Sequence, residues 1–194
     1  ASKNPMAQRE SRHSYSISLE QGEITNQKQS GRCWMFAALN TFRFEVIKNL
    51  NLKTFELSQN YTLFYDKLEK SNYFLESILE TLDEPTQGRL ISFLLSAPLG
   101  DGGQWDMLCN LVRKYGVVPK EAMPETVSSS ATREMTAALT RKLREDACRL
   151  RKAYADGSTL DELRAKKETM MEEIYRVLCI CLGEPPKTFD LEVT

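Results

Sequence analysis

Residues 24–39 of the chain read Ile24-Thr25-Asn26-Gln27-Lys28-Gln29-Ser30-Gly31-Arg32-Cys33-Trp34-Met35-Phe36-Ala37-Ala38-Leu39. This stretch sets one cysteine, Cys33, between a small polar loop and the start of an apolar helix. Gln27 precedes it by six residues. A helix N-terminus stabilises the thiolate, which is the reactive form of cysteine. The layout therefore predicts a thiol nucleophile, Cys33, with two donors for an oxyanion: the Gln27 side chain and the Cys33 backbone N–H.

A lone cysteine at the start of an apolar helix is more often a small buried hydrophobe than a nucleophile. The spacing to Gln27 and the neighbouring Trp34 favour the catalytic interpretation. We expect the Trp34 ring to lie beside the thiol and to exclude water from it. We expect Gly31 to let the chain turn tightly into the helix.

A thiol nucleophile of this kind works with a histidine, and the chain has a single one, His13. Its place in a polar arm, between Arg12 and Ser14, is typical of a solvated surface side chain. We therefore do not expect His13 to be the base.

The composition describes an ordinary globular protein, with 41% hydrophobic and 27% charged residues among 194. A net charge of -1 argues against capture by nucleic acid or by an anionic membrane. No apolar run approaches the roughly 18 residues of a membrane span, and the N-terminus lacks a signal-peptide core. The cysteine count is odd, at five, which favours free thiols in a reducing compartment. We therefore expect a cytoplasmic protein.

Apolar periodicity predicts helices over residues 33–50, from Ser58 to about residue 82, over 89–95 and over 106–115. Ser58 is the expected N-cap of the second helix. Alternation at Tyr15, Ile17 and Leu19 predicts a short strand.

From residue 132 to 182 the pattern is helical and highly charged, and residues 156–158 break it into a hairpin. Ser158 and Asp161 resemble a capping box at the second helix. Residues 188–194 alternate like the opening of a strand. The serines at 128–130 mark a candidate boundary, so we divide the chain into residues 1–127, 128–183 and 184–194.

The stretch around Cys33 resembles the papain-like cysteine peptidases, in which a glutamine and a glycine-rich loop precede Cys-Trp. The loop Gly100-Asp101-Gly102-Gly103 resembles the Gly-Gly segment with which those enzymes hold the substrate main chain. In their secreted members a disulfide joins the two loops. Here Ser30 and Asp101 stand where the resemblance places its cysteines, which agrees with a reducing compartment.

The resemblance is closest to one cytosolic branch of these enzymes, the bleomycin hydrolases and the bacterial aminopeptidases C. The motifs that carry it cover nearly the whole chain: residues 25–28, 31–36, 55–59, 101–107, 114–120, 124–125 and 182–186. The helical hairpin resembles the insertion that distinguishes this branch from papain.

The resemblance implies an α+β papain-like fold, of which this chain is mainly the helical half with its hairpin insertion, ending at the start of the β-rich half. It implies a cysteine aminopeptidase that acts on short peptides through a thioester at Cys33 and assembles as a homo-hexamer. Gly102, Gly103 and Trp34 are the expected substrate-binding residues. The catalytic histidine and asparagine are expected beyond Thr194, so the 194-residue chain is expected to be inactive alone.

The remaining candidate residues do not indicate a further functional site. The thiols of Cys179 and Cys181 lie two apart, face different ways on a helix and have no second ligand pair, so we predict no metal and no cofactor. Cys109 and Cys148 are expected in or near the core, and Trp105 is expected to pack the Gly-Gly loop. No spacing joins Asp101 and Glu56 as an acid–base pair. The basic runs at 141–144 and 149–152 are interleaved with acids, which favours a solvated face over a nucleic-acid site. The alternative function is a non-catalytic folding or assembly module.

Overall fold

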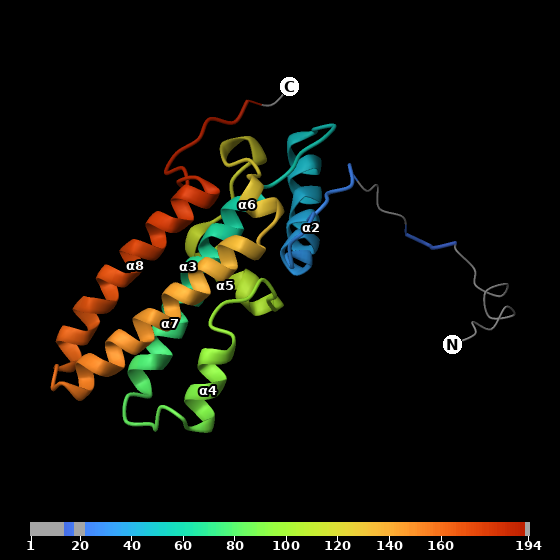
Figure 1. The fold of residues 1–194 in the computed structure, drawn as a ribbon. Coiled ribbons are helices and arrows are strands. Elements are labelled where there is room, and N and C mark those ends of the chain that lie inside the picture. Colours follow the sequence, from blue (N-terminus) through green and yellow to red (C-terminus); the bar gives the residue numbers. More distant parts are fainter. Residues whose placement is uncertain (1–13, 18–21, 193–194) are drawn as a thin grey trace, which may run out of the picture.

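The computed structural model describes residues 14–17 and 22–192, which are mainly helical (Figure 1). The predicted helices are confirmed, with small shifts of their ends. The elements are α2 (Cys33–Leu50), α3 (Gln59–Glu80), α4 (Arg89–Ser96), α5 (Trp105–Tyr115), the 3₁₀ turn η1 (Lys120–Ala122), α6 (Val127–Ser130), α7 (Arg133–Ala155) and α8 (Leu160–Leu182).

Helix α3 is the central element, because it contacts α2, α4, α5, α7 and α8. The Ser58 hydroxyl caps it by accepting a hydrogen bond from the Tyr61 N–H, as predicted. Neighbours on several sides bury polar as well as apolar positions of α3, among them Asp66 and Lys67. Its fully buried apolar side chains are Leu63, Phe64, Leu75 and Ile78.

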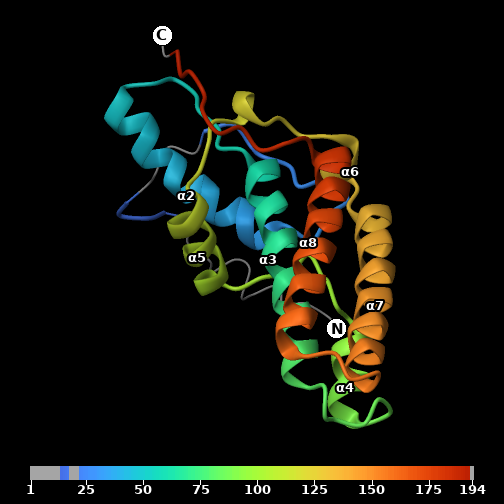
Figure 2. The same ribbon diagram turned by 90° about the vertical axis from the view of Figure 1, so that its left-hand side faces the viewer.

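Helices α7 and α8 form the predicted hairpin and lie along α3 (Figure 2). The predicted capping box was placed one residue too early. Thr159 is the N-cap of α8, and the Glu162 carboxylate accepts from its N–H. The longer glutamate side chain reaches back to the cap, which the shorter Asp161 after Ser158 does not do.

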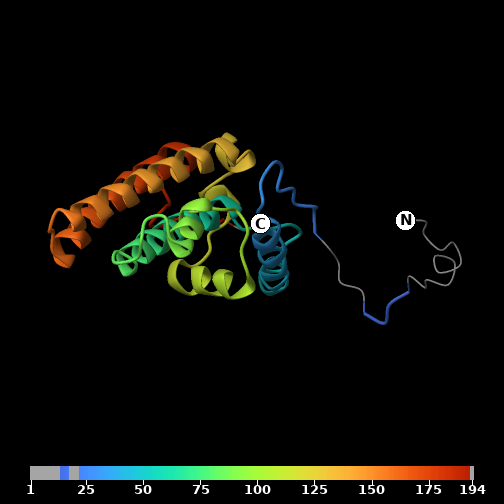
Figure 3. The same cartoon turned by 60° about the horizontal axis from the view of Figure 1, so that its bottom comes forward.

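The hairpin reaches away from the end of the molecule where α2 lies (Figure 3). Its far end is held by side chains of α7. Arg151 donates to the carbonyl of Thr81 at 2.8 Å, and Tyr154 donates to Asp83 at 2.6 Å. The hairpin therefore shares its packing with α3 and the loop that follows α3. Among the described residues, no helix combines the length and the apolar character needed to cross a bilayer.

Both predicted strands are wrong where the structure describes them. Tyr15 and Ile17 are 77% exposed and unpaired with any described segment, and Leu19 lies outside the described residues. Residues 188–192 are likewise not in a strand. A strand needs a pairing partner, which alternation of side chains does not supply. Within the described ranges the only β pairing is two isolated bridges, Gln29 with Ala131 and Leu57 with Pro119.

The serines at 128–130 form most of the short helix α6, which is closed by a capping box between Thr126 and Ser129. Ser129 is fully buried. The division of the chain at residues 127 and 183 stays a prediction.

Candidate active site

Cys33 is the first residue of α2, and its side chain is exposed. The N-cap residue, Arg32, offers no side-chain hydrogen bond to the first turn. The first N–H groups of a helix have no acceptor within the helix, so the N–H groups of Cys33 and Trp34 are open beside the thiol. The predicted place of Cys33, a thiol at a helix N-terminus, is confirmed.

Gln27 lies in a closed turn ahead of the helix. Its side-chain amide donates to the Ser30 carbonyl at 2.5 Å, and the Ser30 hydroxyl donates back to the Gln27 carbonyl at 2.6 Å. Lys28 between them has φ 53°, in the left-handed region. A glutamine amide carries two N–H bonds, so one remains after the bond to Ser30. The role of Gln27 toward an oxyanion stays a prediction.

Asp101 joins the nucleophile loop to the Gly-Gly loop. Its Oδ2 accepts the backbone N–H of Gly31 at 2.9 Å. A Cβ at Gly31 would lie 2.7 Å from the Asp101 Cβ. Glycine is therefore required at position 31 by the close approach of the second loop, rather than by the turn expected from the sequence.

The Asp101 carboxylate is also bound by Lys67 Nζ at 2.6 Å and by the Thr132 hydroxyl at 2.5 Å. Burial alone would raise its pKa, but Lys67, Thr132 and the Gly31 N–H outweigh burial and lower the pKa of Asp101 to about 2. Asp101 is therefore ionised at neutral pH and ties together three segments.

The indole of Trp34 lies against the Gly-Gly loop. Its Nε1 donates to the Asp101 carbonyl at 2.8 Å, and a Cβ at Gly103 would lie 2.5 Å from the ring. A Cβ at Gly102 would meet nothing within 4 Å. The prediction that Trp105 packs this loop is wrong, because Trp105 is 60% exposed and its ring is tilted against Phe42.

Three buried or nearly buried cations beside these loops were missed by the sequence interpretation. Lys67 and Arg32 are fully buried, and Lys70 pairs with the buried carboxylate of Asp66 at 2.8 Å. Arg32 forms a two-pronged ion pair with Glu125, at 2.9 and 2.8 Å, and donates to Ser30 Oγ. Charged residues on a helix are normally read as its solvated face, so pattern alone offers no signal for them.

The remaining candidates are separate from this cluster. Glu56 pairs with Lys120 and not with Asp101. Cys109 is partly buried as expected, whereas Cys148 is exposed, contrary to expectation, because it faces outward on α7. His13 lies outside the described residues, so the described part of the chain has no histidine. The same part contains no group of three His, Cys, Asp or Glu side chains that could hold a metal ion.

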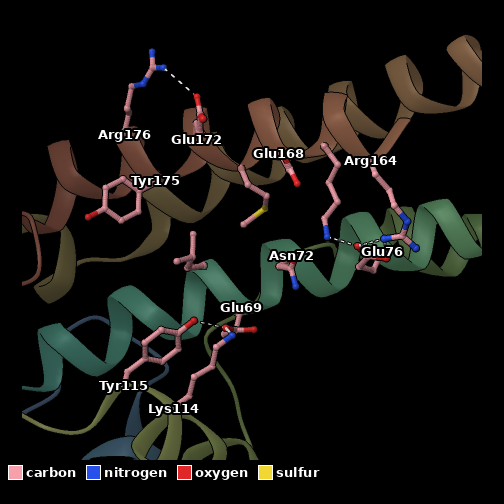
Figure 4. A pocket seen from close by; sticks show the side chains of 13 residues that line it. Glu69, Asn72, Glu76, Lys114, Tyr115, Arg164, Glu168, Glu172, Tyr175 and Arg176 are labelled. Atoms are coloured by element: carbon pink, nitrogen blue, oxygen red, sulfur yellow. Dashed lines mark hydrogen bonds and ion pairs between the residues drawn. The ribbon is translucent and has the colours of Figure 1, made fainter. Parts of the chain in front are cut away.

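Two hollows differ in their relation to the nucleophile loop. One, of about 680 Å³, runs from the nucleophile loop at Ser30 and Gly31, past Asp101, to the first turns of α7. The other, of about 870 Å³, lies between α3 and α8, and Figure 4 shows most of its charged side chains paired with one another, Glu168 excepted. None of the residues that line the second hollow belongs to the nucleophile or Gly-Gly loop.

All of residues 1–194 match the model of the Peptidase C1-like family. The chain belongs to that family. The match to the Peptidase C1-like family spans the loop with Gln27 and Cys33 as well as the hairpin.

Relatives of the chain in this family include peptidases from bacteria and mammals. The chain is 52% identical over 192 residues to aminopeptidase C of Listeria monocytogenes, and 49% identical over 180 residues to human bleomycin hydrolase. The crystal structure of PepW from Lactobacillus rhamnosis superposes with a TM-score of 0.92 at 52% identity and covers 97% of this chain. The expected fold, the helical part of a papain-like peptidase, is confirmed.

The chain spans 43%, 40% and 42% of the lengths of these three relatives, respectively. The same matches include 99%, 92% and 97% of this chain, respectively. The family therefore applies to the whole of this chain, while the chain corresponds to less than half of each relative named.

Proposed function

We propose that this chain carries the nucleophile side of the active site of a cysteine-type aminopeptidase that acts on short peptides. The observation that carries the proposal is the exposed thiol of Cys33 at the first turn of α2, in a loop that Asp101 binds to the Gly-Gly segment. The names of its relatives, aminopeptidase C and bleomycin hydrolase, support the substrate class.

In the proposed reaction, the Cys33 thiolate attacks the carbonyl carbon of the peptide bond. The carbonyl oxygen becomes an oxyanion, held by the Cys33 N–H and the second N–H of the Gln27 amide. The C–N bond breaks, the amine leaves with a proton, and an acyl thioester remains on Cys33. Water then attacks the thioester, releases the acid and restores the thiol. Gly102 and Gly103 hold the substrate main chain, with Trp34 behind them.

The base and acid of this reaction are not among the described residues, which contain no histidine. We therefore propose that the 194-residue chain by itself shows no peptidase turnover. Incubation with aminoacyl fluorogenic substrates tests this, and turnover that is lost in Cys33→Ala would contradict it. Labelling of Cys33 by iodoacetamide, mapped by mass spectrometry, is still expected because the thiol is exposed.

The complete gene product tests the roles of the residues. Cys33→Ala is expected to abolish aminoacyl hydrolysis, and Gln27→Ala is expected to lower kcat by roughly 100-fold or more. Gln29→Ala is the matched control, because that side chain is exposed in the same loop. Equal activity of the Gln27 and Gln29 variants would remove Gln27 from the oxyanion site.

We further propose a cytoplasmic homo-hexamer in which the α7–α8 hairpin is an insertion. Light scattering on the complete gene product tests the assembly. A non-catalytic folding or assembly module is the alternative function, and a complete gene product without Cys33-dependent hydrolysis would favour it.

A further inference from the structure

Three successive carbonyl groups of the Gly-Gly loop each accept hydrogen bonds from a side chain. The Gly100 carbonyl accepts from Lys67 Nζ at 2.7 Å and from Lys70 Nζ at 3.1 Å. The Gly102 carbonyl accepts from Lys70 Nζ at 2.7 Å. The Asp101 carbonyl between them accepts from the Trp34 indole. Three successive peptide groups are thus held by side chains of α3 and α2.

The next residue, Gly103, is different. Neither its N–H nor its carbonyl has a hydrogen-bond partner among the described residues, and a Cβ added to it would lie 2.5 Å from the Trp34 ring. A backbone donor and acceptor left open beside a fixed loop can be satisfied by an extended peptide laid alongside. Among residues 100–103, Gly103 is therefore the one whose carbonyl is left available to a substrate, with its N–H open beside it.

Helix α3 can hold the loop firmly because each lysine is itself anchored. Lys67 and Lys70 are three apart and so share a face of the helix. The fully buried Lys67 pairs with Asp101 at 2.6 Å, and Lys70, whose side chain is 16% exposed, pairs with Asp66 at 2.8 Å. Lys70 Nζ also lies 5.5 Å from the centre of the Trp34 ring. A buried charge requires such partners, and these leave each ammonium little freedom to move.

We propose that Lys70, supported by Lys67, is a positioning residue that turns the Gly102 carbonyl away from the substrate and leaves the main chain of Gly103 free to pair with it. This inference rests on the proposed function. It assigns to α3 a role in substrate binding, whereas the thiol chemistry belongs to α2.

Two reagents separate this role from a merely structural one in the complete gene product. Iodoacetamide alkylates Cys33 without using the Gly-Gly loop. A peptidyl chloromethyl ketone reaches Cys33 only after its main chain lies along Gly103. In Lys70→Met, we expect inactivation by the ketone to slow roughly tenfold or more, because the charged hydrogen bonds to the Gly100 and Gly102 carbonyls are lost. Alkylation by iodoacetamide is expected to stay within about twofold. Lys70→Arg is expected to recover part of the ketone rate.

Two further variants complete the test. Lys114→Met is the matched control, since Lys114 pairs with Glu69 away from the loop, and both rates are expected to stay unchanged. The double variant Asp66→Asn with Lys70→Met removes the carboxylate that the single variant would leave without its lysine. Inactivation of the double variant by the ketone is expected to be as slow as that of Lys70→Met. Thermal unfolding of each variant verifies that it is folded.

The inference is overturned if Lys70→Met lowers the rate of alkylation by iodoacetamide and the rate of inactivation by the ketone by the same factor. It is also overturned if the rate of inactivation by the ketone does not change. It is also overturned if the double variant recovers the ketone rate, because the unpaired Asp66 would then explain the loss. If neither reagent labels Cys33 in the unsubstituted protein, the proposed nucleophile is wrong, and this inference with it. That result is distinct, because it appears before any substitution is made.

Discussion

The backbone N–H of Gly31 donates to the carboxylate of Asp101 at 2.9 Å, across 70 residues of chain. This contact joins the two loops that the resemblance to secreted papain-like enzymes would join by a disulfide. Ser30, at the position of the first expected cysteine, does not take part and bonds instead to Gln27 and Arg32. In this chain the two loops are therefore linked at Gly31, one residue after Ser30, through the carboxylate of Asp101.

Asp101→Asn is expected to lower the free energy of unfolding by about 3 kcal/mol, because the fully buried ammonium of Lys67 loses its charge partner. Urea unfolding of the two proteins measures this. Lys114→Met breaks an ion pair with a 62% exposed lysine and is expected to change the free energy by less than about 1 kcal/mol. Equal effects of the two substitutions would show that Asp101 is not a structural centre.

The same carboxylate gives the stability a dependence on pH. Its pKa of about 2 in the folded chain lies below the value of about 3.9 expected when unfolded, so the unfolded chain binds more protons in that range. The stabilisation by Asp101 is present above about pH 4 and is lost as the pH falls toward 2. Asp66 acts in the opposite sense, since burial raises its pKa. Urea unfolding between pH 6 and 3 should show a shallower acid loss in Asp101→Asn, and equal slopes would contradict the prediction.

Arg32→Lys tests whether the buried fork to Glu125 is needed. A lysine cannot make the two parallel bonds to the carboxylate or the further bond to Ser30, so we expect a loss of about 2–4 kcal/mol in unfolding free energy. Arg149→Lys is the control, because Arg149 is 55% exposed in its pair with Glu145, and its effect should stay below about 1 kcal/mol. A loss below that limit in Arg32→Lys would refute the prediction.

The hairpin is expected to be stabilised by the apolar side chains that α8 buries. Leu178 is fully buried, and Leu178→Ala should lower the unfolding free energy by about 2–5 kcal/mol. Ile180, two residues further, is 84% exposed, and Ile180→Ala should change it by about 0.5 kcal/mol or less. Denaturant unfolding measures both, and similar values would mean that α8 does not pack as described.

The two glycines of the Gly-Gly pair should respond differently to alanine. Gly103→Ala puts a methyl group into the Trp34 ring and is expected to lower the unfolding free energy by about 1–3 kcal/mol. Gly102→Ala meets open space, so its structural effect should be small. The fluorescence of Trp34, measured with Trp105→Phe to remove the other indole, should shift in Gly103→Ala only. A shift in both variants would argue against the contact.

The sequence predicts the helices well because their apolar spacing, the cap at Ser58 and the stop at Gly116 are local signals. Cys33 is placed correctly for the same reason. The strands fail because pairing is not local. The contacts of Lys67 and Asp101 also could not be predicted, since they depend on how α3 lies against two loops. A buried lysine and a surface lysine look alike in a helical pattern, and only the fold separates them.

Thr132, just ahead of α7, donates its hydroxyl to Asp101, and the preceding residue pairs with Gln29 in the nucleophile loop. The root of the hairpin is thus fastened to the loop that presents the thiol. Excising the hairpin, or grafting it onto another peptidase of the family, would remove a support from that loop. A hairpin grafted onto another peptidase is therefore expected to support the nucleophile loop only if Thr132 and Asp101 are transferred together.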